Sequence, residues 1–405
     1  MGIDAATRLV RVHAGSSKCA GVRGGRLSGK DGWAQADVLA FMPSAPQRKG
    51  QVSGPFRDWR NRLRVDVLAA LADFVAHGCA ADMVPAGIDI AADVLEGVLE
   101  GGKCLRSTYA YLGWLCGADD DDAALRAAAS FELLHAFALL QDDVMDGSAL
   151  RRGRPSAHVR FAWWHRDRGL SGSPERFGES AAVLLGDLCL VWAQQMLRES
   201  GIGAEALSRA WPHYDAMRTE LAVGQFADLV NHSGTFPTLA QVLDVSRRKS
   251  GNYTVRRPLE IGAVLAGCNS GTVTLLGRYG AAVGEAFQLR DDVLGIFGDP
   301  TVTGKPAGAD LAEHKATSVV VAAHHLADVN ARRQLCELMS AEDLNEDDLR
   351  RWRALIAATG AVDWIEQQID SRLARALDWI DTGQLSAVVR AALADMAVAC
   401  TGRAA

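Results

Sequence analysis

The chain has 405 residues, of which 49% are hydrophobic and 23% are charged, and its net charge is −6. This composition is ordinary for a folded globular protein, and the length allows one large domain or two. The negative balance argues against a general nucleic-acid binder, which needs a positive surface field. The eight cysteines include no CxxC pair, which predicts reduced thiols, no zinc site and a cytoplasmic protein.

Residues 1–55 differ in composition from the rest of the chain. They hold many glycines, no glutamate, and eight lysines or arginines against three aspartates. Because such a segment cannot bury a core, we expect a disordered basic tail followed by a folded domain over residues 56–405. Two alternatives remain, namely a transit peptide and a start codon assigned too early, with Met42 as the true start.

Apolar residues recur at helical spacing from Phe56 onward, and residues 86–99 repeat the pattern before two glycines end it. No alternating strand pattern competes, so the sequence predicts an all-α fold. Residues 163–179, with their glycines and arginines, are expected to form a loop before an apolar helix at 180–197. No uninterrupted apolar run reaches the roughly 18 residues of a membrane span.

The stretch Asp-Asp-Val-Met-Asp at 142–146 carries the first chemical signal. Asp142 and Asp146 are four residues apart and share a helix face, whereas Asp143 points aside. Hard carboxylate oxygens suit Mg²⁺, which takes one or two protein carboxylates and completes its shell with water and substrate phosphate. Arg151 and Arg152 follow, and guanidinium groups match phosphate oxygens.

A second acidic cluster, Asp291 and Asp292, precedes a loop at 298–315 that is rich in glycine and lysine. Two carboxylate clusters, each beside basic residues, predict several Mg²⁺ ions that clamp one polyphosphate. Glycine-rich loops with lysines often close over anionic ligands, so we expect residues 298–315 to act as a lid.

These motifs and their order resemble the trans-isoprenyl diphosphate synthases, also called polyprenyl synthetases, and most of all the geranylgeranyl diphosphate synthases. The likeness runs from about residue 60 to the C-terminus. The motifs that carry it are Gly101-Gly102-Lys103-Cys104-Leu105-Arg106, the aspartate-rich stretch with Arg-Arg-Gly-Arg-Pro, Gly224-Gln225-Phe226-Ala227-Asp228-Leu229, Lys249-Ser250 with Tyr253, and Phe287-Gln288-Leu289-Arg290-Asp291-Asp292.

The resemblance implies a bundle of roughly a dozen helices around a deep central cavity, a homodimer, and a Mg²⁺-dependent prenyltransferase with three ions. In this reaction an allylic diphosphate ionises, the double bond of isopentenyl diphosphate attacks the cation, and the released diphosphate takes up the proton. The catalytic residues implied are Asp142, Asp146, Asp291, Lys249 and Lys305. The metal ligands implied are Asp142, Asp146 and Asp291.

The resemblance also implies which side chains bind the two diphosphates. Those expected on the allylic side are Arg151, Lys249, Ser250, Gln288, Lys305 and Lys315. Those expected to hold isopentenyl diphosphate are Lys103, Arg106, His135 and Arg152.

Product length is implied by two residues on the helix that precedes the first acidic stretch. Phe137 lies five residues before Asp142, about 7.5 Å along a helix, and the small Ala138 lies next to it. In the family an aromatic residue five positions before the motif blocks the growing chain, and one aromatic beside an alanine resembles the C20 type. An ordinary core aromatic is the alternative interpretation.

The sequence departs from the family pattern at four positions. Cys104 and Ser107 stand where arginine and proline are usual, and Gln141 replaces a common histidine. Gly295 takes the place of the last aspartate in the second acidic motif. The loss of that carboxylate is expected to weaken metal binding, although Asp291 remains.

Three other functions stay open. A class I terpene cyclase shares a helical cavity and aspartate clusters but lacks the Gly-Gly-Lys-x-x-Arg element and the arginine pair. A non-catalytic partner subunit typically loses the first aspartate-rich motif, which this chain keeps. A synthase with a C15 product, or one longer than C20, is also open.

Overall fold

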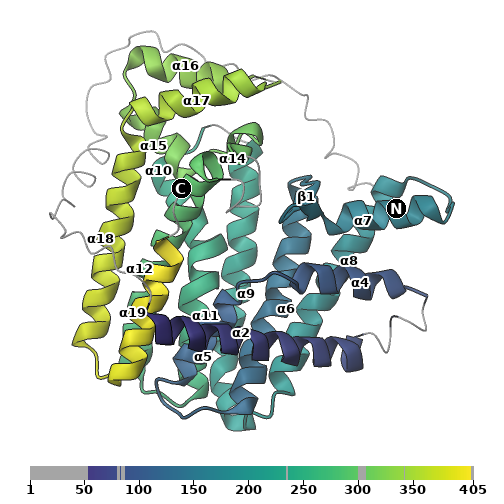
Figure 1. Cartoon of the computed structure of the whole chain (residues 1–405), viewed down its shortest axis with the longest axis vertical. Helices are drawn as coiled ribbons and strands as arrows, with labels where there is room; N and C mark the ends of the chain where they lie inside the picture. Colours follow the sequence, from purple (N-terminus) through teal and green to yellow (C-terminus); the bar gives the residue numbers. More distant parts are fainter. Residues whose placement is uncertain are drawn as a thin grey trace, which may run out of the picture. The chain divides into compact units, whose positions relative to one another are not determined.

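The computed structural model describes residues 53–79, 83, 87–233, 236–299, 307–341 and 343–402. This part of the chain is helical apart from one hairpin of two short strands (Figure 1), which confirms the predicted all-α fold. Residues 1–52 of the tail expected at 1–55 lie outside the described residues, and so does Lys305. Gly54 and Pro55, the last two residues of the expected tail, already belong to the first described helix.

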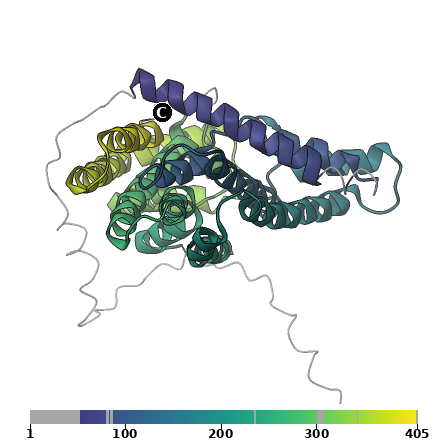
Figure 2. The same cartoon turned by 90° about the horizontal axis from the view of Figure 1, so that it is seen from below.

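The first half of the described chain holds the helix with the first acidic stretch and the hairpin with the arginine pair. Its elements are α2 (Gly54–Phe74), the π-helix η1 (Val75–Cys79), α4 (Asp89–Leu99), α5 (Leu105–Trp114), α6 (Asp122–Met145), β1 (Leu150–Arg151), β2 (Arg154–Pro155), α7 (Ala157–Asp167) and α8 (Pro174–Arg198). Seen from below, α2 lies across helices that are viewed end-on (Figure 2), and it packs on α5 and α6.

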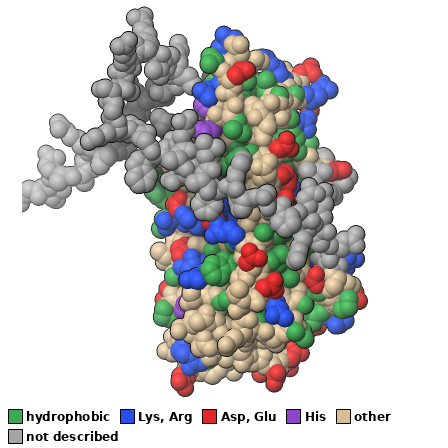
Figure 3. Space-filling view, turned by 90° about the vertical axis from the view of Figure 1, so that its left-hand side faces the viewer, with side chains coloured by type: hydrophobic (Ala, Val, Ile, Leu, Met, Phe, Trp, Pro, Cys, Tyr) green, Lys and Arg blue, Asp and Glu red, His purple; other side chains and the backbone are tan. Residues whose placement is uncertain are grey.

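The second half holds the second acidic cluster on a long helix. Its elements are α9 (Ala204–Ser233), α10 (Leu239–Ser246), the π-helix η2 (Arg247–Arg256), α11 (Arg257–Leu265), α12 (Ser270–Phe297), α14 (Ala309–Ala312), α15 (Ser318–Leu326), α16 (Val329–Met339), α17 (Glu346–Ala358), α18 (Ala361–Thr382) and α19 (Ala387–Thr401). Basic and acidic side chains are interspersed on the face in Figure 3, in keeping with the modest net charge.

Helix α6 begins at the end of an acidic run at residues 119–122. The Asp121 side chain accepts hydrogen bonds from the backbone N–H groups of Ala123 and Ala124, which satisfies donors that a helix start leaves unpaired. From there the helix continues through apolar residues to Met145, so Asp142 and Asp146 stand at its C-terminal end.

Two helices, α6 and α8, are long and apolar enough to cross a membrane when judged by length and composition alone. They pack against each other, and 61% of the apolar window of α6 and 44% of that of α8 are buried inside the fold. Both contribute to the main hydrophobic core, so they are core helices. Charged residues interrupt both, which is why no unbroken apolar run stands out in the sequence.

The loop expected at residues 163–179 is much shorter in the structure. Helix α7 continues to Asp167, and α8 already begins at Pro174, capped by the Ser173 hydroxyl. Packing of α7 against α8 overrides the polar composition, and only the six residues between them form the turn, where Gly169 and Gly172 adopt positive φ angles.

Candidate active site

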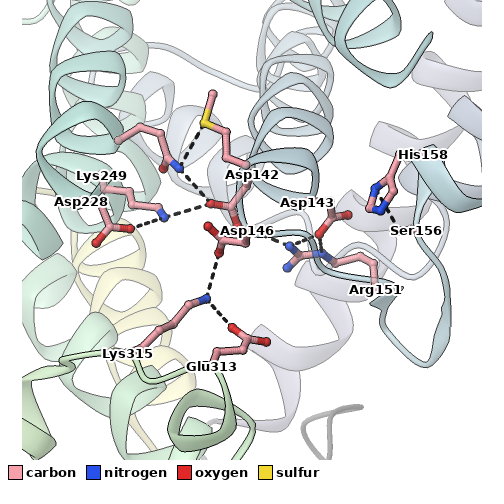
Figure 4. Close-up of polar contacts among 12 residues, drawn as sticks. Asp142, Asp143, Asp146, Arg151, Ser156, His158, Asp228, Lys249, Glu313 and Lys315 are labelled. Atoms are coloured by element: carbon pink, nitrogen blue, oxygen red, sulfur yellow. Dashed lines mark hydrogen bonds and ion pairs between the residues drawn. The ribbon is translucent and has the colours of Figure 1, made fainter. Parts of the chain in front are cut away.

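Asp142 lies among three nitrogen donors near the end of α6 (Figure 4). Its Oδ1 accepts from Lys249 Nζ at 2.9 Å and from Gln225 Nε2 at 3.2 Å, and its Oδ2 lies 3.4 Å from Arg151 Nη2. Lys249 also donates to Asp228 at 2.8 Å. Burial disfavours the Asp142 carboxylate, but the Lys249 ammonium holds its pKa below the usual value. Asp142 is therefore ionised and matched by a cation.

Asp146, one turn further on, meets a second lysine. Lys315 Nζ lies 2.9 Å from Asp146 Oδ2 and 2.7 Å from Glu313 Oε2. Burial alone would lower the pKa of Lys315, but the two carboxylates raise it, so the ammonium is fully charged. Figure 4 shows Asp142 and Asp146 turned toward Lys249 and Lys315.

Asp143 points to the other side of α6, as the helical spacing predicts. It is buried and accepts two hydrogen bonds from Arg151, one of them from Nε at 2.8 Å. Burial raises the pKa of Asp143, and the Arg151 guanidinium opposes this. Asp143 therefore fixes the arginine beside Asp142 and does not share the outward face.

Asp292 is likewise turned into the protein. Its carboxylate accepts from Gln288 Nε2 at 2.8 Å, and from the backbone N–H and the hydroxyl of Ser318 at 3.0 and 2.5 Å. Ser318 begins α15, so this bond ties the segment after Lys315 to α12. One short loop thus reaches Asp292 on α12 and Asp146 on α6, which brings the two acidic stretches together. The Gln288 amide is engaged with Asp292 and not with the first acidic stretch.

Lys249 and Ser250 lie in the π-helix η2. π-Helical turns are rare and frequently occur at functional sites. The backbone of Lys249 closely approaches Gly224 on α9, where an added Cβ would lie 2.5 Å from the Lys249 nitrogen. Only glycine allows this approach, and it places Gln225 and Asp228 beside the lysine.

Arg106 and His135 form a second basic group. Arg106 Nη2 donates to Thr254 Oγ1 at 2.9 Å, and its guanidinium carbon lies 4.3 Å from the ring centre of Tyr253. Within the described part of the chain, Arg106 Nε and His135 Nδ1 are buried without a hydrogen-bond partner. Burial, and then Arg106, lower the pKa of His135 well below its usual value, so its imidazole is neutral.

Arg152 is bonded elsewhere, at the end of α4. Arg152 has a positive φ of 52° in the hairpin turn, and its Nη1 donates to the carbonyls of Val98 and Glu100 at 3.2 and 2.6 Å. The Lys103 side chain is exposed. A cavity of about 1090 Å³ between α4, α6, α7 and the hairpin is lined by Arg152, and it adjoins the Asp143 side of α6.

Glu132 is a residue near the candidate site that sequence analysis overlooked. It is buried, and its Oε1 accepts from the hydroxyl of Ser107 at 2.8 Å and from its N–H at 3.3 Å. A proline at position 107 could not donate either bond. The signal available in the sequence was the spacing of three between Glu132 and His135, which places both on one helix face.

Two other departures from the family pattern also have structural roles. The Gln141 amide donates to the carbonyl of Val183 and to Asp187, both at 3.3 Å, and so joins α6 to α8. Cys104 is buried at the start of α5 with a positive φ of 48°.

Phe137 and Ala138, expected at the floor of the cavity, are partly buried and pack against the main core.

The donor set suits Mg²⁺. Among the described residues, no three His, Cys, Asp or Glu side chains converge into a cage that would hold a metal alone. Asp142 and Asp146 instead present hard oxygens on one helix face, and cationic nitrogens already meet them there. This matches Mg²⁺, which uses few protein carboxylates and relies on water and substrate phosphates for its other ligands.

Comparisons with known proteins agree with this geometry. The family model for polyprenyl synthetase matches residues 89–356. The chain belongs to the polyprenyl synthetase family. This membership also confirms the predicted enzyme class, a trans-prenyltransferase.

Two curated relatives and one solved structure illustrate the similarity. The chain is 34% identical over 283 residues to geranylfarnesyl diphosphate synthase from Aeropyrum pernix, covering 69% of this chain and 82% of that protein. It is also 34% identical over 278 residues to geranylgeranyl diphosphate synthase from Mycobacterium tuberculosis, covering 68% and 74%. A crystal structure of geranylgeranyl pyrophosphate synthase from Corynebacterium glutamicum, complexed with isoprenyl diphosphate and magnesium, superposes with a TM-score of 0.79 at 35% identity, covering 85% and 98%.

Proposed function

We propose that the protein condenses isopentenyl diphosphate with an allylic diphosphate and releases geranylgeranyl diphosphate, a C20 product. The observation that carries the proposal is the outward face of α6, where Asp142 and Asp146 meet Lys249 and Lys315. Carboxylates for metal and ammonium groups for phosphate stand side by side there, in a chain of the polyprenyl synthetase family. The names of the relatives support the reaction class.

On the allylic side, the barrier is the negative charge that builds on the departing diphosphate. Asp142, Asp146 and Asp291 would hold Mg²⁺, three ions by family resemblance, and the metal supplies positive charge to that group. Lys249 and Lys315 exchange their carboxylate partners for phosphate oxygens when substrate and metal arrive. The ammonium groups are already in place, so they stabilise the developing charge with little reorganisation.

We assign further contacts on the allylic side from the family resemblance. Arg151, held by Asp143, reaches one side of the diphosphate. Ser250 contributes from η2, and Lys305 from the loop that lies outside the described residues. Gln288 would first have to release Asp292 before its amide could reach the diphosphate.

On the other side, Arg106 and His135 would bind the diphosphate of isopentenyl diphosphate. Their buried nitrogens have no partner in the described part of the chain, and a diphosphate supplies acceptors to them. Lys103 and Arg152 would swing toward it from the surface and from the end of α4. The released diphosphate then accepts the proton, so the protein needs no dedicated base.

The C20 length depends on Phe137 and Ala138. An aromatic ring about 7.5 Å below Asp142 along α6 ends the space for the chain, and the neighbouring alanine leaves room beside it. The names of the two relatives cover both C20 and C25 products, so family membership alone does not fix the length.

We also propose a cytoplasmic homodimer. On α8, Leu184, Leu188 and Val191 form one helix face and are 64%, 36% and 61% exposed. A second copy of the chain would cover this apolar stripe. Light scattering should give twice the monomer mass, and Leu184→Glu with Val191→Glu should give a monomer. An unchanged dimer in the double variant would exclude this face.

Product analysis tests the function. Purified protein with Mg²⁺, labelled isopentenyl diphosphate and dimethylallyl, geranyl or farnesyl diphosphate should give a C20 alcohol after dephosphorylation. A C15 or C25 alcohol would support the proposed reaction and contradict the proposed C20 product. No condensation with any primer would reject the enzyme and leave a non-catalytic partner subunit.

A further inference from the structure

Gly295 lies on α12 four residues after Asp291, so both positions share one helix face. By family resemblance an aspartate is usual at this place in the second acidic motif. Its loss leaves Asp291 and Asp292, and Asp292 is already bonded to Gln288 and Ser318. Mg²⁺ takes one or two protein carboxylates, so a second oxygen donor from the chain on this face would have to come from another segment.

The carboxylate of Asp310 lies against Gly295. A Cβ atom built on Gly295 would lie 2.5 Å from Asp310 Cγ and 3.0 Å from Oδ1, and it would be closer still to Oδ2. Real Cβ atoms do not approach neighbours so closely, so no larger residue fits at 295 while Asp310 stays in place. The space that a side chain at 295 would need is therefore filled by a carboxylate from another segment.

Asp310 is held firmly in this position. It belongs to the short helix α14, which packs against α12, and the next residue, Leu311, is fully buried in the core that α12 shares with α17. The N–H of Lys315 donates to the Asp310 carbonyl at 2.8 Å. The same segment that presents Asp310 to α12 thus presents Lys315 to Asp146 on α6.

We propose that Asp310 supplies the carboxylate that Gly295 lacks, and that it binds the Mg²⁺ ion on the Asp291 side of the diphosphate. The inference rests on the proposed function and adds a metal-binding residue to it. The second acidic motif is then assembled from two segments, with Asp291 from α12 and Asp310 from α14. A chain without the last aspartate would then still offer two carboxylates to this ion.

The geometry predicts that the carboxylate can be moved from position 310 to position 295 only when both residues are changed together. Asp310→Ala removes the carboxylate and empties the space beside Gly295. Gly295→Asp alone places a second side chain and a second negative charge in the same volume, which forces α14 away. With both changes together, one carboxylate and one small residue again share this volume.

Isothermal titration calorimetry of inorganic diphosphate at a series of Mg²⁺ concentrations tests the proposal without relying on turnover. The concentration of Mg²⁺ for half-saturation should rise about 10- to 100-fold in Asp310→Ala and in the isosteric Asp310→Asn. Gly295→Asp should also bind weakly, and the double variant Gly295→Asp with Asp310→Ala should return to within about threefold of the wild type. The control is Asp363→Asn, which changes an exposed carboxylate in the first turn of α18 and should leave binding unchanged.

Wild-type affinity in both Asp310 variants, or a double variant no tighter than Asp310→Ala, would overturn the assignment of Asp310 while leaving the proposed function intact. If the wild type itself binds no diphosphate in the presence of Mg²⁺, both fail. Thermal melts without Mg²⁺ verify that each variant is folded. If Asp310→Ala is unfolded, the test relies on the Asp310→Asn variant.

Discussion

Replacement of Phe137 by alanine tests the link between one side chain and product length. The residue lies five positions before Asp142, and its ring is partly buried against the main core. Exchange of phenyl for methyl opens space on the order of 100 Å³ about 7.5 Å below the metal face, roughly the room of one five-carbon unit. We therefore expect the main product to lengthen from C20 to C25.

The assay is chromatography of the dephosphorylated products, with Phe137→Tyr as the matched control that keeps the ring and the C20 product. Ala138→Phe adds a second ring one residue closer to Asp142 and should shorten the product to C15. A fully buried phenylalanine costs about 3–5 kcal/mol of unfolding free energy when truncated, so this partly buried one should cost about 1–3 kcal/mol. A thermal melt should show a modest loss of stability.

An unchanged C20 product in Phe137→Ala would refute the reasoning, because the floor would then lie on another helix. The same holds if Ala138→Phe makes C20 at an undiminished rate. The thermal melt first identifies any variant that makes no product because it is unfolded, and neither conclusion is drawn from such a variant.

Three further predictions concern Gly224, Lys249 and His135. Gly224→Ala should displace η2, because the new Cβ would lie 2.5 Å from the Lys249 nitrogen. In denaturant titrations the unfolding free energy should be about 1–3 kcal/mol lower, and the condensation rate should fall by a larger fraction than the stability does. Lys249→Met should slow condensation about 100-fold in steady-state assays and increase the rise in melting temperature on adding Mg²⁺, because Asp142 loses its cation. Burial, and then nearby arginines, lower the pKa of His135 in the folded protein, so the unfolded chain takes up a proton there first as the pH drops. At pH values below about 6.5 the unfolding free energy should therefore decrease, by at most about 1.4 kcal/mol per pH unit. His135→Gln should flatten this fall in melts from pH 7 to 5, whereas the same change at the exposed His77 should not.

Much of the site follows from local rules of sequence. The spacing of Asp142 and Asp146 fixes their shared face on any helix, and it sends Asp143 to the opposite side, where the structure finds it bound to Arg151. The acidic run before α6 acts as a cap because aspartate oxygens accept from free N–H groups at a helix start. These features need only neighbours in sequence, so they can be read without a structure.

Other features depend on distant parts of the chain and stay hidden in the sequence. The π-helix that carries Lys249 forms where Gly224 on α9 lets two backbones approach, and residue spacing in the sequence does not reveal it. Arg152 binds the carbonyls at the end of α4, a contact that no motif encodes. The meeting of Asp310 with Gly295 also depends on how α14 packs on α12.

The measurement that tests the central claim most directly is the Mg²⁺-dependent condensation rate of wild-type protein and of Asp142→Asn, with isopentenyl diphosphate and an allylic primer. We predict robust condensation in the wild type, none after chelation of Mg²⁺, and a loss of about 10²- to 10³-fold in Asp142→Asn with the fold retained. Condensation that proceeds equally well in Asp142→Asn, or that ignores chelation, would contradict the role of the α6 face.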